Sequence, residues 1–259
     1  MEQAQQNALK LQQDLANIDY LRIYFGDPYV VNDKIVLRQP SLGEILAYGE
    51  RDYWSLVYTL TAIPSDFKPE LFDKGIDYEA VSDLEFFHML SSTLPPEKTS
   101  ILFGDIDLTK LRMYRQKNND ELVLYDADSG VRIDRRLHMI IQGYLTTLHN
   151  IKKKVEHAGN FMTKQIMIED DRQRKKRNAD KPWRSTMLPL VSTMVNHPGF
   201  KYNAEQVRDM KLFAFMDSVA RIASMNTSNL LLQGAYAGKV DMKKVDKKSL
   251  DWMRDLYVS

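Results

Sequence analysis

The sequence predicts an α+β protein in which helices predominate, with one or two small antiparallel sheets in the N-terminal half and a helical C-terminal half. Apolar residues recur at helical spacing along most of the chain, and two capping pairs precede apolar stretches. Short β-branched or aromatic runs bounded by turn residues are confined to the first 135 residues. With 259 residues, 44% of them hydrophobic, the chain is long enough to bury a core.

The first segment has the spacing of an amphipathic helix. Its apolar residues alternate at intervals of four and three: Ala4, Ala8, Leu11, Leu15 and Ile18. Such a seam packs on its own domain or pairs with another helix as a short coiled coil. We favour the first because the heptads are few, and we keep these five residues as the candidate partner-binding surface, with a homo-oligomer left open.

Residues 1–159 are predicted to form an α+β domain with hairpins near 21–38 and 121–134. In the first hairpin, β-branched or aromatic runs at 21–25 and 33–38 flank a Gly-Asp-Pro turn. In the second, the strands are 121–125 and 131–133, and a further strand is expected at 100–103. The sequence Asp-Ala-Asp-Ser-Gly at 126–130 supplies the turn of the second hairpin.

Helix starts are marked by two capping boxes in this domain. Ser41 and Glu44 predict a helix that runs to about Ala62, and Ser82 and Glu85 predict another. The clearest helical stripe lies further along, from 137 to 155, and ends near Gly159. We expect this last helix to be central to the core.

The remaining chain is predicted to be helical. Residues 160–184, where an acidic cluster runs into a basic one, indicate a charged helix or linker and a domain boundary. Residues 185–259 form the helical C-terminal region, with helices expected at 186–196, 203–224 and 227–236 and a short one around 250–256.

The composition argues against several classes of protein. A formal net charge of +1 is not that of a dedicated nucleic-acid binder, so a nucleic-acid partner is not expected. The absence of Cys excludes disulfides and thiolate sites and fits a reducing compartment. Neither a secretory leader nor an apolar run of about 18 residues is present, so we expect no membrane association.

Two short acidic patterns invite a metal-dependent interpretation. Asp66-x-Lys68 has the spacing used by one class of Mg²⁺-dependent nucleases, but it follows a helix stop and has no convincing strand around it. Asp126-x-Asp128-x-Gly130 resembles the start of a calcium loop but lacks the closing glutamate, and we interpret it as a hairpin turn. A nuclease using Asp66 and Lys68 is kept as a minor alternative.

The histidines do not form a recognisable metal site. His138 and His149 are expected to share a helix face near the apolar stripe, where packing or capping roles are favoured over metal binding. The G-x-S-x-G elbow of serine hydrolases is also missing. We therefore predict no catalytic residue, no metal site and no cofactor.

A basic run in the charged segment is the candidate nucleic-acid site under an alternative interpretation. Its cations are Arg172, Arg174, Lys175, Lys176 and Arg177. Such residues bind phosphates with release of counterions, which makes binding salt-dependent. Asp170 and Asp171 partly cancel this charge, so we favour a solvated helix face.

Residues 21–62 place a short expected hairpin before a helix start. Above all, residues 35–45, Ile-Val-Leu-Arg-Gln-Pro-Ser-Leu-Gly-Glu-Ile, contain the helix-start pattern Pro-[ST]-[LV]-x-[ED]-[IL]. In these features the sequence resembles tail assembly chaperones and related tail-module proteins of long-tailed bacteriophages. Residues 75–79, 82–87 and 233–241 add to this resemblance.

This resemblance implies a non-enzymatic protein of the host cytoplasm. Its partners would be the helical tape-measure protein, which it coats, and the tail-tube subunits, which it helps to polymerise. An apolar helix of this kind can be shielded in a groove between amphipathic helices. The alternative is a structural component of the virion, such as a baseplate or connector subunit, which would remain in the particle.

Overall fold

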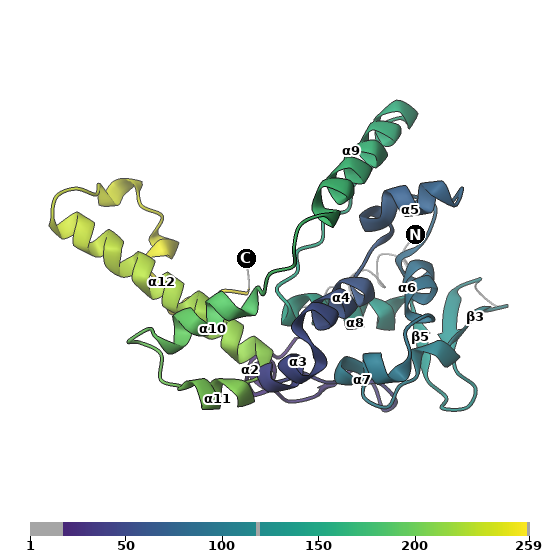
Figure 1. Ribbon diagram of the computed structural model, residues 1–259, viewed down its shortest axis with the longest axis horizontal. Helices are drawn as coiled ribbons and strands as arrows, with labels where there is room; N and C mark the ends of the chain where they lie inside the picture. The colour runs from purple at the N-terminus through teal and green to yellow at the C-terminus, as the bar shows by residue number, and fades with distance from the viewer. Residues whose placement is uncertain (1–17, 118–119, 258–259) are drawn as a thin grey trace.

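The computed structural model describes residues 18–117 and 120–257. It is 56% helical, with two small antiparallel sheets in the N-terminal half and helices in the C-terminal half, which confirms the predicted fold class. Figure 1 shows a body of short helices and sheets from which two long helices project in different directions, α9 (Phe161–Ala179) and α12 (Leu212–Tyr236).

The described chain begins with a helix where a strand was expected. Residues 20–25 form α2 (Tyr20–Phe25), because the Asp19 side chain accepts hydrogen bonds from the backbone N–H groups of the first turn and Gly26 ends the helix at φ +79°. The hairpin lies just beyond, with β1 (Tyr29–Val30) antiparallel to β2 (Val36–Leu37). The prediction of a strand at 21–25 was therefore wrong, and the hairpin occupies 29–37.

The capping box at Ser41 and Glu44 is confirmed, but the helix after it is divided. It forms α3 (Leu42–Tyr48) and α4 (Glu50–Leu60), separated by Gly49 at φ +95°. This backbone conformation is open to glycine and strained for other residues, so the chain changes direction here. The expectation of one helix to Ala62 missed the break.

A series of short helices follows: η1 (Pro64–Phe67), α5 (Lys68–Asp73), α6 (Asp83–Ser91), α7 (Pro96–Phe103) and η2 (Leu108–Lys110). The capping box of Ser82 and Glu85 is confirmed at the start of α6. The strand expected at 100–103 is instead the last turn of α7. Pro96 stands at the first helical position, where its missing N–H costs nothing.

The second sheet has the order β3-β4-β5 and is antiparallel throughout. Its hairpin of β4 (Leu122–Tyr125) and β5 (Arg132–Asp134) confirms the one predicted near 121–134. The turn is held by Asp126, whose side chain accepts from the Asp128 N–H. The third strand, β3 (Arg112–Arg115), is exposed along its whole length, so it carries no burial pattern that the sequence could reveal.

Helix α8 (Arg135–Leu148) is the central helix expected from the apolar stripe, although it is shorter. Its buried face is Ile141, Tyr144, Leu145 and Leu148. Asn150 takes a left-handed conformation at φ +50°, which ends the helix and lets the Ile151 N–H bond to a carbonyl of the last turn. Residues 151–158 are therefore not helical.

The C-terminal half contains α9, α10 (Met187–Val195), α11 (Ala204–Asp209) and α12, followed by η3 (Met242–Lys244) and η4 (Lys247–Ser249). The predicted 203–224 helix is interrupted near Lys211, which forms a β-bridge with Ser41, whereas α12 runs unbroken through 225–226. The final helix expected around 250–256 is replaced by turns. At each of these two breaks the backbone bonds to a distant part of the chain. The Met210 carbonyl accepts from the Leu42 N–H, and the carbonyls of Leu250 and Trp252 accept from side chains of α12.

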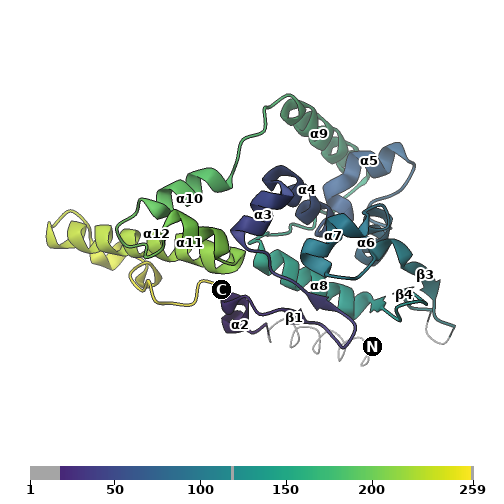
Figure 2. The same ribbon diagram turned by 60° about the horizontal axis from the view of Figure 1, so that its bottom comes forward.

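One main core connects the two halves of the chain. It contains buried residues from α2, β2, α3, α4 and α8 together with Met187, Val207 and Phe215 from the C-terminal helices. Figure 2 shows α2 and β1 against these helices. Helix α2 packs on α12, and the Tyr29 ring stacks on Tyr144 of α8 with 4.5 Å between ring centroids. The division at 160–184 stays a prediction, but residues on both sides of it share this core.

Candidate functional site

An apolar groove lies between α3, α10 and α11. Its volume is about 240 Å³. The side chains that line it come from positions far apart in the sequence: Leu42, Ile45, Leu46, Glu50, Ser185, Met187, Leu188, Val191, Ala204, Val207 and Arg208. The groove is therefore a product of the tertiary structure.

The base of the groove is formed by close packing of α3 on α11. The Leu42 N–H donates to the Met210 carbonyl at 3.0 Å, and the Leu212 N–H donates to the Pro40 carbonyl at 3.1 Å. Gly43 permits this approach, because a Cβ at that position would lie 3.0 Å from the Arg208 carbonyl oxygen. These backbone contacts fix the position of both helices.

Two leucines at the groove remain exposed to solvent. Leu46 of α3 and Leu188 of α10 are 63% and 66% exposed, although Ile45 and Met187 next to them are buried in the main core. Exposed apolar side chains beside a recess are typical of surfaces that bind another protein. An amphipathic helix is the secondary structure that such grooves commonly accept.

Glu50 fixes the start of α10 at one end of the groove. Its carboxylate accepts hydrogen bonds from the backbone N–H groups of Thr186 and Met187 at 2.8 and 2.9 Å. Burial disfavours the charged form, but hydrogen bonds from Ser185, Met187 and Thr186 outweigh it and hold the pKa of Glu50 below its usual value. Its acceptor capacity is thus used within the protein.

The groove offers chemistry for binding and not for bond breaking. Its lining is mainly aliphatic, and Glu50 is occupied in capping α10. Its volume is below that of a typical small-molecule pocket, which is roughly 300–1,000 Å³. It is suited to a few apolar side chains projecting from one face of a partner helix.

Most of the surface predicted at the N-terminus lies outside the described residues, namely Ala4, Ala8, Leu11 and Leu15. Ile18 is described and is 7% exposed, packed in the main core. Ile18 therefore packs inside its own chain and is not available to a partner. Ile18 is not one of the residues that line the groove.

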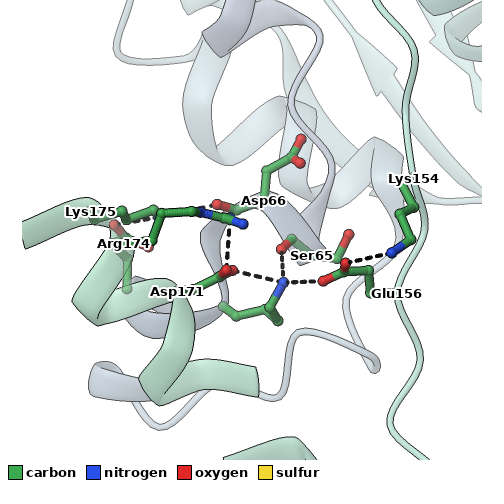
Figure 3. Close-up of polar contacts among 9 residues, drawn as sticks. Ser65, Asp66, Lys154, Glu156, Asp171, Arg174 and Lys175 are labelled. Atoms are coloured by element: carbon green, nitrogen blue, oxygen red, sulfur yellow. Dashed lines mark hydrogen bonds and ion pairs between the residues drawn. The ribbon is translucent and has the colours of Figure 1, made fainter. Parts of the chain in front are cut away.

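Lys68, half of the proposed nuclease pair, belongs to a buried ion cluster. Its ammonium group lies 2.8 Å from Asp171 Oδ2, 2.8 Å from Glu156 Oε2 and 2.8 Å from the Ser65 carbonyl oxygen. Figure 3 shows how these groups converge from three separate segments. Burial lowers the pKa of Lys68, but the hydrogen bonds that its ammonium group donates to Asp171 and Glu156 outweigh burial and raise it.

Asp66 points to other partners. Its Oδ2 accepts from the Ile63 N–H at 3.0 Å and pairs with Lys153 at 2.8 Å. Asp66 and Lys68 thus have separate structural roles, one as a cap and the other as the centre of the ion cluster. Their geometry gives no support to the nuclease alternative.

The basic run on α9 is largely paired with acidic side chains. Arg172 bonds Asp73, Arg174 lies 2.7 Å from Asp171, and Lys175 lies 2.6 Å from Glu70. Lys176 and Arg177 are exposed, and the described residues give them no ion pair. The run mainly fastens α9 to α5 and supplies little free positive charge.

The histidines expected near the apolar stripe are both buried. His149 Nδ1 lies 2.7 Å from the Leu145 carbonyl oxygen and Nε2 lies 2.6 Å from the Tyr53 hydroxyl. His138 packs against Phe87. Within residues 18–117 and 120–257, no group of three or more acidic or histidine side chains is arranged to hold a metal ion.

Comparison with known protein families gives a match in the C-terminal region. Residues 175–257 match the YomV second domain, a family of phage origin described from a Bacillus prophage. The matched region contains α10, α11 and α12 and hence one side of the groove. No curated protein and no solved structure matches the chain.

None of the described helices is both long enough and apolar enough to cross a bilayer. The similarity to a phage-derived domain family is confined to residues 175–257 and leaves the specific role of the chain open.

Proposed function

We propose that this is a non-enzymatic phage tail assembly protein, a chaperone whose apolar groove holds an amphipathic helix of the tape-measure protein. The observation that carries the proposal is the groove itself, in which Leu46 and Leu188 are exposed and the lining is mainly aliphatic. Such a groove can cover the apolar side chains of a partner helix before the tail is assembled.

Two independent similarities meet at this groove. Its α3 side begins with Pro40-Ser41-Leu42-Gly43-Glu44-Ile45, within the sequence that resembles tail assembly chaperones. Its α10 and α11 sides lie in the region that matches the phage-derived family. The groove therefore joins the segment that resembles tail assembly chaperones to the region that matches the phage-derived family, which supports the proposal.

Co-expression with the tape-measure protein and the tail-tube subunit of the same phage genome tests this function. A variant carrying Leu46→Glu and Leu188→Glu places two charges at the groove while leaving the core intact, because both side chains are exposed in the free protein. We expect it to lose capture of the tape-measure protein by about tenfold or more, since a charge buried under an apolar helix is costly.

A matched control is Leu21→Glu with Val30→Glu, because both residues are 65% exposed and lie outside the groove. Capture should survive in this control. Equal capture by both double variants would reject the groove as the binding site, and failure of the wild type to bind either tail protein would reject the tail assembly function. Mass spectrometry of purified particles then separates a chaperone, which is absent, from a structural virion component, which is present.

A further inference from the structure

The charges of this protein are unevenly distributed along the chain. Residues 175–257 contain fifteen Lys and Arg residues against eight Asp and Glu, whereas the preceding 174 residues contain 21 against 27. The net charge of +1 is therefore the sum of an acidic part and a basic part. Such an asymmetry points to an anionic partner for the basic part.

Five of these fifteen basic residues lie in the ten-residue segment 239–248, after α12. This segment contains two successive 3₁₀ turns, η3 and η4, and each is preceded by the sequence Val-Asp. Asp241 accepts a hydrogen bond from the Lys243 N–H, and Asp246 accepts one from the Lys248 N–H, both at 3.0 Å. We refer to residues 239–248 as the lysine turns.

All the cations of the lysine turns are exposed: Lys239, Lys243, Lys244, Lys247 and Lys248. In the part of the chain that the structure describes, no ion pair is made by any of these five side chains, although Asp241 and Asp246 stand among them. This separates them from the run on α9, where Arg172, Arg174 and Lys175 are bound to carboxylates.

The lysine turns are fastened to α12 at both ends. At the start, the Lys239 N–H donates to the Gly234 carbonyl at 2.8 Å. At the end, Ser228 Oγ donates to the Leu250 carbonyl at 2.9 Å, and Arg221 donates to the carbonyls of Trp252 and Arg254. The segment thus folds back along the projecting helix (Figure 1), so the lysines are displayed on an ordered support.

Two exposed aromatic residues flank the lysine turns in the sequence. Tyr236, the last residue of α12, is 90% exposed, and Trp252 is 38% exposed. Aromatic side chains near lysines are the combination with which proteins bind single-stranded nucleic acids, by stacking on unpaired bases and pairing with phosphates. An acidic protein segment would bind through the lysines alone and would make no use of the aromatic side chains.

We infer that the lysine turns form a nucleic-acid binding site that contacts the phosphate backbone, with Tyr236 and Trp252 available to stack on unpaired bases. This inference is independent of the groove and goes beyond the proposed function. It assigns binding to lysines that the sequence-based alternative did not consider, and it leaves the α9 run in its structural role.

Fluorescence anisotropy of a labelled DNA oligonucleotide, as single strand and as duplex, tests the site across a range of NaCl concentrations. The variant replaces Lys243, Lys244, Lys247 and Lys248 by Gln in the full chain. We expect its affinity at low salt to fall about tenfold or more, and the slope of log K against log salt to decrease by about three to four. The substitution Tyr236→Ala should lower the affinity for the single strand more than the affinity for the duplex.

A matched control replaces four exposed lysines that precede the charged segment 160–184 by Gln: Lys34, Lys74, Lys98 and Lys152. It removes the same charge and should retain both the affinity and the salt slope. Equal losses in the two variants would overturn the assignment to the lysine turns, as would absence of wild-type binding to either DNA at low salt. Polyglutamate can be added as a competitor of the labelled DNA. If it displaces the DNA as effectively per charge as unlabelled DNA does, the assignment is overturned and an acidic protein partner is indicated.

Discussion

His149 shows how a single polar residue is accommodated inside the main core. Its ring lies at the end of α8, where one nitrogen faces the Leu145 carbonyl and the other faces the Tyr53 hydroxyl. Donation from Nδ1 to the carbonyl leaves Nε2 to accept from the hydroxyl, so the neutral ring satisfies both contacts. Burial lowers the pKa of His149, as it does that of His138, to about 4.

These histidines predict a loss of stability between neutral and mildly acidic pH. An unfolded histidine takes up a proton near pH 6.5, whereas these two do so near pH 4 when folded. The unfolded state therefore binds more protons in this window, and the free energy of unfolding falls as the pH drops, by about 3 kcal/mol for each histidine by pH 4. Urea denaturation at a series of pH values measures this fall.

The variant His149→Gln should flatten the pH dependence, and His157→Gln is the control because the His157 side chain is 77% exposed. A wild-type stability that stays constant from pH 7 to pH 4 would contradict the expectation. Carboxylates whose pKa is lowered by folding, such as Glu50 and Glu156, add to this fall only as the pH approaches their unfolded value of 4.5, so the fall between pH 7 and about pH 5.5 reports the histidines.

At the scale of the element, α9 is held to the body mainly by charged groups. Of its 19 residues, Ile168 and Asp171 are buried. Its partners are the acidic residues of α5 and of the following loop, through the pairs Arg172–Asp73, Lys175–Glu70 and Lys164–Glu79, together with the Lys68 cluster. An attachment of this kind depends on ionic strength, because exposed ion pairs are screened by salt.

Hydrogen exchange should therefore reveal α9 as a salt-sensitive element. Raising NaCl from about 0.05 to about 0.5 M should speed amide exchange in α9 on the order of fivefold, while α8 should change little because its packing is apolar. Mass spectrometry of exchanged peptides provides the measurement. Equal responses of the two helices would show that α9 is not held by its ion pairs.

For the whole molecule, the shared core couples the two halves. Phe213 and Phe215 at the start of α12 are buried in the same cluster as Tyr53 and Leu56 of α4, although about 160 residues separate them. The distal part of α12 departs from this core and carries Leu230 and Tyr236 at 68% and 90% exposure. The groove lies within the coupled region, and the lysine turns lie on the projecting part (Figure 1).

This arrangement predicts one cooperative unit that includes α4 and the start of α12. In native-state hydrogen exchange at increasing denaturant, the slowest amides of these two segments should converge on one opening free energy, to within about 1 kcal/mol. Amides beyond Ser228 should exchange through smaller openings. Two distinct global free energies, one for each half, would instead show two independently folding domains.

The sequence by itself determined the helical α+β class, both capping boxes, the 121–134 hairpin and the position of α8. These features depend on local spacing and on side chains that bond neighbouring backbone groups, as Ser41 and Ser82 do. It misassigned 21–25 and 100–103, where apolar residues fit a strand or a helix equally well. In those segments a cap at Asp19 and a proline at position 96 decided the outcome.

Only the tertiary structure decided where the candidate sites lie. Leu46 and Leu188 have no sequence signal that pairs them. They line one groove because Gly43 lets α3 approach the α11 backbone and because Glu50 holds the start of α10. The basic run at 172–177 and the lysine turns look alike as sequences, yet carboxylates from distant segments pair with the first and leave the second exposed. Whether a charge is neutralised depends on its neighbours in space, which local sequence does not specify.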